Sequence, residues 1–216
     1  MIFHQNADMR ISDDRYSRER ARMELALRFL HHEARTQTIR AWTGLSDDRI
    51  RKLYRSYMSQ ACRLLPRHRG KSPHQVAYFT RSLRLQEETA LLASMLSLLG
   101  VVPAPAAPAS APAAGAPTPA SGNTSAAGAA AGAPPLPGVT RGELLCQAFE
   151  AFQLLLPAAQ ISFEHAVFLA TALARGDQLR LGDCSGCGSL MVMERFRLRS
   201  ALCSHCAGAV PARGHG

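Results

Sequence analysis

Apolar side chains recur at helical spacing both before and after the middle of the chain. The i, i+3, i+4 pattern predicts one helix over 17–33 and a longer helix over 78–99. The late part of the second helix is apolar nearly all round, so it needs a covering surface, either elsewhere in the chain or on another subunit. The apolar positions of the first helix are Met23, Ala26, Leu27, Leu30 and Ala34.

After the middle of the chain, the pattern predicts two further helices and two short strands. One helix covers 144–156, where a proline ends it. Ser162 is a suitable N-cap for the next helix, and Gly176 ends it because glycine readily adopts the left-handed conformation. Apolar residues then alternate with polar ones over 179–181 and recur at 190–193, which is typical of short strands.

The segment 103–138 is predicted to be a linker. It consists almost entirely of Ala, Pro, Gly, Ser and Thr and has no charged or aromatic side chain. Repeated prolines prevent a continuous helix, and too little apolar area can be buried to offset the entropy of ordering the segment. The chain is therefore expected to divide into a helical module (1–102), a flexible linker (103–138), a helical module with a cysteine site (139–206) and a flexible tail (207–216).

Within the first module, two short helices joined by a tight turn are expected. The first covers 38–43, Gly44 ends it by adopting a positive φ, and Ser46 caps the second, which covers 47–57. Ile50 falls where a helix-turn-helix packs an apolar residue between its two helices. Leu53, Tyr54 and Tyr57 continue that inner face.

The positive charge of the chain is concentrated in its first half. The formal net charge is +9, and residues 1–100 carry eighteen Lys or Arg against ten acids. No acid lies between Asp48 and Glu87, whereas ten basic residues do, which favours binding of a polyanion such as DNA over a merely solvated basic surface. Helix-turn-helix geometry also occurs in proteins that never meet DNA, so the local charge is what favours a DNA-binding interpretation. The candidate DNA contacts are Arg49, Arg51, Lys52 and Arg55 on the outer face of the second helix, Arg67, Arg69 and Lys71 beyond it, and Arg195, Arg197 and Arg199, which equally fit a solvent-facing strand edge.

Four cysteines near the end of the chain form two CxxC pairs. Cys184 and Cys187 are separated by fifteen residues from Cys203 and Cys206, which is the spacing of a tetrahedral zinc site. Four thiolates leave no open position for water, so zinc there would stabilise the fold rather than activate a substrate. Disulfides, unpaired thiols, a redox CxxC pair and an iron-sulfur centre are the alternatives. His165, within the helix that precedes the cysteines, is expected to be a packed or surface residue rather than a metal ligand.

No segment of the sequence is expected to enter a membrane. The N-terminal residues lack the apolar core of a signal peptide, and no run approaches eighteen consecutive strongly apolar residues. A cytoplasmic location is therefore expected, and in a reducing compartment paired cysteines usually bind metal. No carboxylate pair, nucleophile with a base, or phosphate-binding loop stands in a persuasive context, so binding rather than catalysis is expected.

Three parts of the sequence together resemble the FlhC family, the larger subunit of the bacterial flagellar master transcriptional activator. They are LSDDRIRKLYRSY at 45–57, FEHAVFLATALARGDQLRLGDC at 163–184, and the knuckles CSGC and LCSHC. The resemblance implies a mainly helical protein that binds one zinc ion per chain through the four cysteines. It also implies a hetero-oligomer with a small FlhD-like subunit, binding to promoter DNA upstream of flagellar class II genes, and recruitment of RNA polymerase. The alanine- and proline-rich insertion departs from the compact family pattern.

The expected fold class is therefore mainly α. A helical N-terminal module with a helix-turn-helix, which binds DNA and a partner, is expected to precede a helical module that ends in a small, zinc-ribbon-like site of four cysteines. The expected function is that of a DNA-binding transcriptional activator. The alternatives are a zinc-stabilised regulatory interaction protein, as a diverged paralogue without a flagellar role, and a thiol-redox or iron-sulfur protein.

Overall fold

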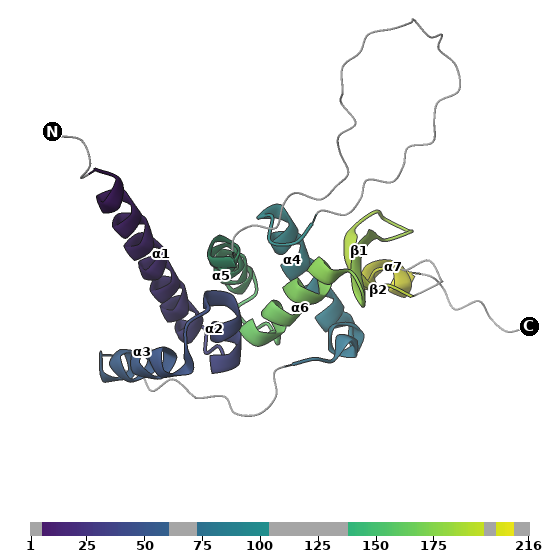
Figure 1. Cartoon of the computed structure of the whole chain (residues 1–216). Coiled ribbons are helices and arrows are strands. Elements are labelled where there is room, and N and C mark those ends of the chain that lie inside the picture. Colours follow the sequence, from purple (N-terminus) through teal and green to yellow (C-terminus); the bar gives the residue numbers. More distant parts are fainter. Residues whose placement is uncertain (1–5, 61–72, 104–137, 197–201, 210–216) are drawn as a thin grey trace, which may run out of the picture.

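The protein is mainly helical and carries one small antiparallel sheet (Figure 1). The computed structural model describes residues 6–60, 73–103, 138–196 and 202–209. The mainly helical fold class is thereby confirmed. The described elements are α1 (Asn6–His31), α2 (Thr36–Thr43), α3 (Asp47–Gln60), the 3-10 helix η1 (Val76–Thr80), α4 (Leu83–Leu98), α5 (Gly138–Leu155), α6 (Phe163–Arg175), β1 (Leu179–Asp183), β2 (Leu190–Glu194) and α7 (Ser204–Ala209).

The helix ends follow the predicted capping chemistry at several positions. The side chain of Ser162 accepts a hydrogen bond from the backbone N–H of His165 at the start of α6. Gly176 ends α6 at φ 64°, and Gly44 ends α2 at φ 70°. Both glycines adopt the left-handed conformation that a side chain disfavours, so these two stops are encoded locally.

The prediction of one long helix over 78–99 is wrong for the first part of that range. The chain forms the short helix η1 there, and α4 begins only at Leu83. Ser82 has an extended backbone, with φ −140° and ψ 154°, and its hydroxyl accepts a hydrogen bond from the N–H of Leu85 at 3.3 Å. The cap therefore starts a new helix at a place where apolar spacing alone suggested continuity.

The helix expected over 17–33 is present but lies further toward the N-terminus. It begins at Asn6 and ends at His31. Glu33 has a positive φ of 59°, and the N–H of Ala34 donates to the carbonyl of Phe29 at 2.9 Å. This closure turns the chain into α2, so that the two helices pack against each other.

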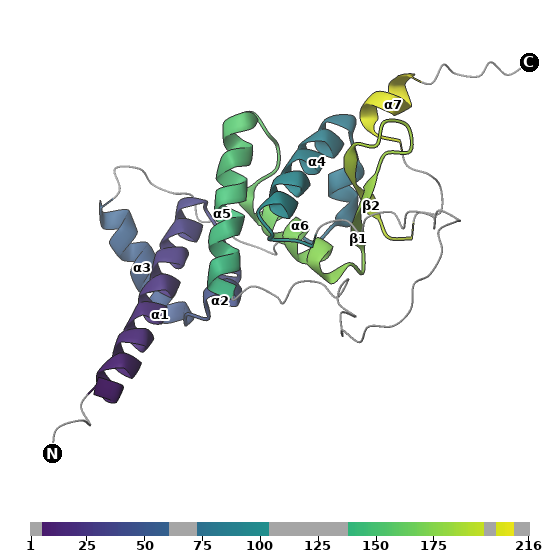
Figure 2. The same ribbon diagram turned by 90° about the horizontal axis from the view of Figure 1, so that it is seen from above.

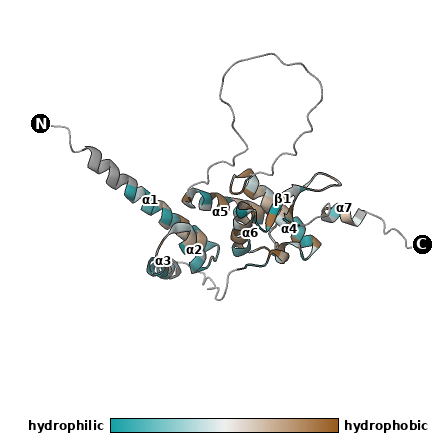
Figure 3. Ribbon diagram, turned by 45° about the vertical axis from the view of Figure 1, so that its right-hand side comes forward, coloured by the Kyte–Doolittle hydropathy of each residue, from teal (hydrophilic) through white to brown (hydrophobic). Residues whose placement is uncertain are grey.

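A single hydrophobic core joins the segments on either side of 104–137. Helix α5 lies between α1 and α4, and the apolar colours gather where α4, α5 and α6 meet (Figures 2 and 3). The aromatic rings of Phe29, Phe149 and Phe163 lie at the centre, with the Phe163 ring centroid 5.0 Å from Phe29 and 5.3 Å from Phe149. Residues of α1 and of α5 and α6 are thus buried against one another.

Buried carboxylates add polar ties between these same segments. Glu164 of α6 is 8% exposed and accepts hydrogen bonds from the N–H of Arg35 at 2.8 Å and the hydroxyl of Thr38 at 3.0 Å. Glu88 of α4 likewise accepts from the N–H of Gln160 at 2.8 Å. Because buried charge is costly without such partners, each tie favours one specific arrangement of its helices.

The stability of this core is expected to fall when the pH drops below about 6.5. His32 stacks on Phe163 at 4.8 Å and contacts the carboxylate of Glu150 at 3.0 Å, and burial lowers the pKa of His32 below its ordinary value of 6.5 despite that carboxylate. The unfolded chain then takes up a proton that the folded chain resists, so stability present above 6.5 is lost as the pH falls.

Urea unfolding at pH 7.5 and pH 5.5 measures this effect. The His32→Gln variant keeps a donor for Glu150 but cannot titrate, so it should lose less stability than the wild type over the same range. Because one group titrates, the loss of unfolding free energy in the two proteins cannot differ by more than about 1.4 kcal/mol per pH unit. Equal losses in the two proteins would show that His32 is not responsible.

Candidate metal centre

The two cysteine pairs are positioned by the β-hairpin and by the start of α7. Strand β1 pairs with β2 from Leu179 opposite Glu194 to Asp183 opposite Leu190, and Cys184 follows β1 directly. The backbone carbonyl of Cys184 then accepts a hydrogen bond from the N–H of Gly188 at 2.9 Å, which closes a tight turn around Cys187. Alternating apolar residues predicted these strands correctly.

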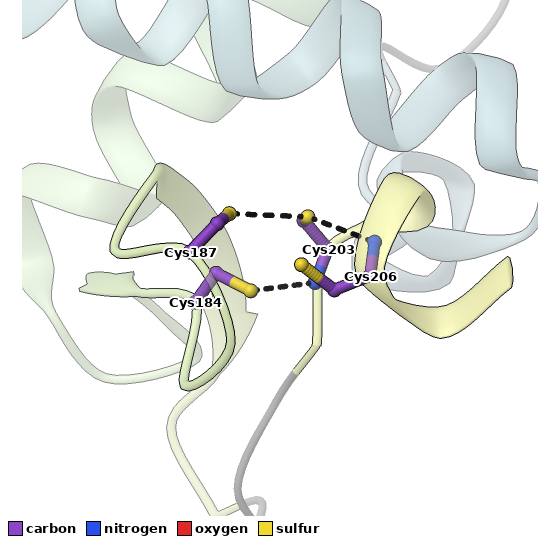
Figure 4. A group of neighbouring side chains, drawn as sticks. All are labelled: Cys184, Cys187, Cys203 and Cys206. Carbon is purple, nitrogen blue, oxygen red and sulfur yellow. Dashed lines mark hydrogen bonds between the residues drawn. The ribbon is translucent and has the colours of Figure 1, made fainter. Parts of the chain in front are cut away.

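The four predicted cysteines come together and can hold a metal ion such as zinc (Figure 4). Their sulfur atoms all lie within 4.8 Å of one another, and those of Cys187 and Cys203 are 3.6 Å apart. Sulfurs bound tetrahedrally to zinc at about 2.3 Å would be separated by about 3.8 Å, so the cluster fits such an ion with small adjustments. All four are free thiols, which excludes disulfides between them in this structure.

Backbone amides aimed at the sulfurs prepare the cluster for a cation. The N–H groups of Cys203 and Gly186 lie 3.2 and 3.4 Å from the sulfur of Cys184 and donate to it. These donors, together with the N–H of Cys187, lower the pKa of Cys184 to about 6. Hydrogen bonds to the sulfurs of Cys187 and Cys203 raise the pKa of Cys206 to about 12, so a metal would have to displace its proton.

The side chain of Cys206 lies so close to position 186, between the first two cysteines, that glycine is required there. A Cβ atom on Gly186 would lie 3.0 Å from the sulfur and 3.2 Å from the Cβ of Cys206. Sequence reasoning missed Ser189, whose hydroxyl lies 3.1 Å from the sulfur of Cys187. Its position two residues after a candidate ligand was the only signal in the sequence.

The cysteine cluster has its own small apolar surroundings. Met191 and Met193 of β2 are buried beside Cys184, apart from the main core. Helix α4 packs against β2 and connects this unit to the rest of the molecule. A metal here would stabilise the hairpin and α7, at the end of the molecule remote from α3 (Figures 1 and 2).

His165 lies in α6 and does not join the cysteines. Its Nδ1 atom is 2.7 Å from the hydroxyl of Ser162, and its ring stacks on Tyr78 with centroids 4.0 Å apart. Burial lowers its pKa below the ordinary value. Of the two expected placements, packed or on the surface, the structure thus shows His165 packed, against Tyr78 of η1.

The predicted DNA contacts of α3 fall into two groups. Arg49 forms an ion pair with Glu19 of α1, and Arg51 lies 3.2 Å from Asp48. Lys52 and Arg55 are exposed, and neither has an ion-pair partner among the residues that the structure describes.

The remaining basic candidates are not gathered at α3. The side chain of Arg195 donates to the carbonyl of Gly176, and its backbone N–H donates to the carbonyl of Gln178 at 2.9 Å. Arg195 therefore holds the hairpin beside the end of α6, far from α3 (Figure 1). Arg67, Arg69, Lys71, Arg197 and Arg199 lie outside the described residues, as does nearly all of the predicted linker and the tail from residue 210.

In the part of the chain that the structure describes, no helix is long and apolar enough to cross a membrane.

Comparison with known proteins leaves the family of the chain open. A scan against protein-family models finds no match, and a search of curated proteins finds none either.

Proposed function

We propose that this protein is a DNA-binding transcriptional activator of the FlhC type, whose last part is stabilised by one zinc ion. The observation that carries the proposal is the form of α3, which is apolar on its inner face and cationic outside. Ile50 is 2% exposed and belongs to the main core, whereas Lys52 and Arg55 face solvent. Such a helix can meet a polyanion without loss of packing.

The turn between α2 and α3 supports a helix-turn-helix. Gly44 adopts the left-handed conformation, and Leu45 is buried at 3% exposure directly after it. The acids at the start of α3 would repel phosphates, but Asp47 lies 3.7 Å from Arg40 and Asp48 lies 3.2 Å from Arg51. These ion pairs leave the positive charge of Lys52 and Arg55 in excess on the outer face.

The partners of the proposed activator follow from the resemblance to the FlhC family. We propose promoter DNA of flagellar class II genes, a small FlhD-like subunit and RNA polymerase. Four leucines at the ends of α4 and α5 are exposed and can add apolar area to a contact with such a subunit. These are Leu83, Leu98, Leu154 and Leu155.

The same leucines favour the second candidate, a zinc-stabilised interaction protein that does not bind DNA. Co-expression with an FlhD-like subunit, followed by native mass measurement and metal analysis, tests both association and the identity of the metal. A coloured protein containing iron would instead indicate an iron-sulfur centre. Association without any affinity for DNA would support the second candidate.

Reversal of the two exposed charges on α3 is expected to weaken DNA binding by about a hundredfold, because two phosphate attractions become repulsions. The variant is Lys52→Glu with Arg55→Glu, and binding is measured by fluorescence anisotropy with a class II promoter fragment and with a mixed-sequence duplex. The control removes the same charge far from α3, through Arg175→Glu and Arg180→Glu, which are both exposed. Equal losses of DNA affinity in the two variants would show that α3 contributes only through the net charge of the protein.

A further inference from the structure

Three arginines of α1 form a second cationic feature next to α3. Arg15, Arg18 and Arg22, here called the arginine stripe, are all exposed. At 3.6 residues per turn they lie within about 60° of one another around the helix. The stripe therefore occupies one face of α1, beside α3 and next to the N-terminal end of the helix, which projects beyond the other helices (Figures 1 and 2).

The face of α1 that carries the stripe is the one that is buried further along the helix. Leu25, Ala26, Phe29 and Leu30 continue the same face and are at most 5% exposed. A face intended for another apolar surface would keep its apolar pattern toward the N-terminus. The change to arginine at the three stripe positions instead favours contact of this part of the face with an anionic surface.

An ion pair holds the stripe in place beside α3. Glu19, which lies among the three arginines, binds Arg49 of α3. Lys52 follows Arg49 by three residues, so it lies on the same side of α3. Beside the stripe is a hollow of about 480 Å³ that, of the residues described, is lined by Arg15, Arg18, Glu19 and Arg22.

We propose that the arginine stripe binds backbone phosphates of the same DNA duplex that α3 contacts. This inference rests on the proposed function. Arg15 and Arg22 are seven residues apart, or about 10.5 Å along the helix axis, and phosphates of one strand rise about 3.4 Å each. With α1 lying along the duplex axis, the stripe thus spans about three phosphate steps of one strand, and guanidinium groups bind phosphate oxygens in a bidentate manner.

Duplex DNA fits this surface better than an acidic protein does. The stripe continues through Glu19 and Arg49 into α3, whose exposed Lys52 and Arg55 extend the same charge. A regularly charged rod can follow both helices at once, and its affinity grows with each phosphate that is neutralised. The stripe makes α1 an additional positioning element that would fix the orientation of α3 on the duplex.

A salt titration of DNA binding by the full-length protein tests the inference. The stripe variant combines Arg15→Gln, Arg18→Gln and Arg22→Gln. Binding of a fluorescein-labelled mixed-sequence duplex is followed by anisotropy at several salt concentrations. The control variant removes equal charge elsewhere through Arg20→Gln, Arg175→Gln and Arg180→Gln, and Arg20 lies on the opposite side of α1. Circular dichroism and thermal unfolding establish that both variants fold.

The stripe variant is expected to bind about tenfold or more weakly at physiological salt, with its salt slope reduced by up to about 2.7, because each lost phosphate contact removes about 0.9. The control should keep the wild-type slope. If the stripe variant has the same DNA affinity and salt slope as its control, the inference is overturned. If in that case the Lys52 and Arg55 variant still loses DNA affinity, the proposed function stands. Unchanged DNA binding with lost association of an FlhD-like subunit would assign the stripe to a protein partner and overturn it as well. A wild-type protein without affinity for the duplex would overturn both proposals.

Discussion

Replacement of Cys203 by serine is expected to lower the metal content from the proposed one zinc ion per chain to less than about a tenth of an ion. Its sulfur lies 3.6 Å from that of Cys187, and its backbone N–H donates to the sulfur of Cys184. Three thiolates and a hydroxyl bind zinc far more weakly than four thiolates do. Metal analysis after gel filtration measures the loss.

Loss of the metal should unfold only one end of the molecule. The cysteine cluster is surrounded by Met191 and Met193, whereas the helices α1 to α6 belong to a different core. Hydrogen exchange should therefore accelerate over 184–196 and 202–209 and change little in the helices α1 to α6. This local outcome distinguishes a stabilising ion from one on which the whole fold depends.

Cys146 offers a matched control for the same experiment. It is a fully buried free cysteine of α5, outside the cluster, and burial raises its pKa to about 12. The Cys146→Ala variant should keep its metal and its exchange pattern over 184–196 and 202–209. A Cys203→Ser protein that retained one metal per chain and normal protection there would contradict the zinc assignment.

The four-cysteine cluster was predictable because its chemistry is local in sequence. Each CxxC pair places two sulfurs within one turn, and the spacing between the pairs is long enough to close a tetrahedron. Gly44, Ser162 and Gly176 were predictable for a similar reason, since a cap depends on the conformation of one residue and its near neighbours.

Features that depend on distant contacts were not accessible in this way. The pairing of Arg49 with Glu19 joins residues thirty positions apart, and nothing in the spacing of charges identifies it. The bond from Thr38 to Glu164 joins segments 126 residues apart. Apolar periodicity shows that a helix has a buried face but leaves open which helix covers it.

The arrangement of the core changes the physical meaning of the alanine- and proline-rich segment. Composition predicts that 103–138 connects two modules, yet the helices before and after it bury the same aromatic rings. Closing a loop costs only about 0.6 kcal/mol more for each doubling of its length, so a long insertion can be accommodated within one cooperative core. The insertion then need not uncouple α2 and α3 from the cysteine cluster.

Replacement of Phe149 by alanine is expected to destabilise helices on both sides of that insertion by about 3–5 kcal/mol. Phe149 of α5 is 2% exposed, and its ring lies 5.5 Å from that of His32 and 5.3 Å from that of Phe163. The cavity would remove contacts that α1, α5 and α6 share, and the loss is a large part of the roughly 5–15 kcal/mol typical of a domain. Urea unfolding measures the total effect.

Hydrogen exchange of the Phe149→Ala protein decides whether the core is cooperative, because shared packing should weaken protection in α1 and α2 as well as in α5 and α6. Leu154→Ala provides the control on the same helix, since Leu154 is 82% exposed and its truncation should change stability by no more than about 0.5 kcal/mol. If protection fell in α5 and α6 while α1 and α2 stayed as in the wild type, the two segments would fold separately, and the joint burial of their rings would contribute little to stability.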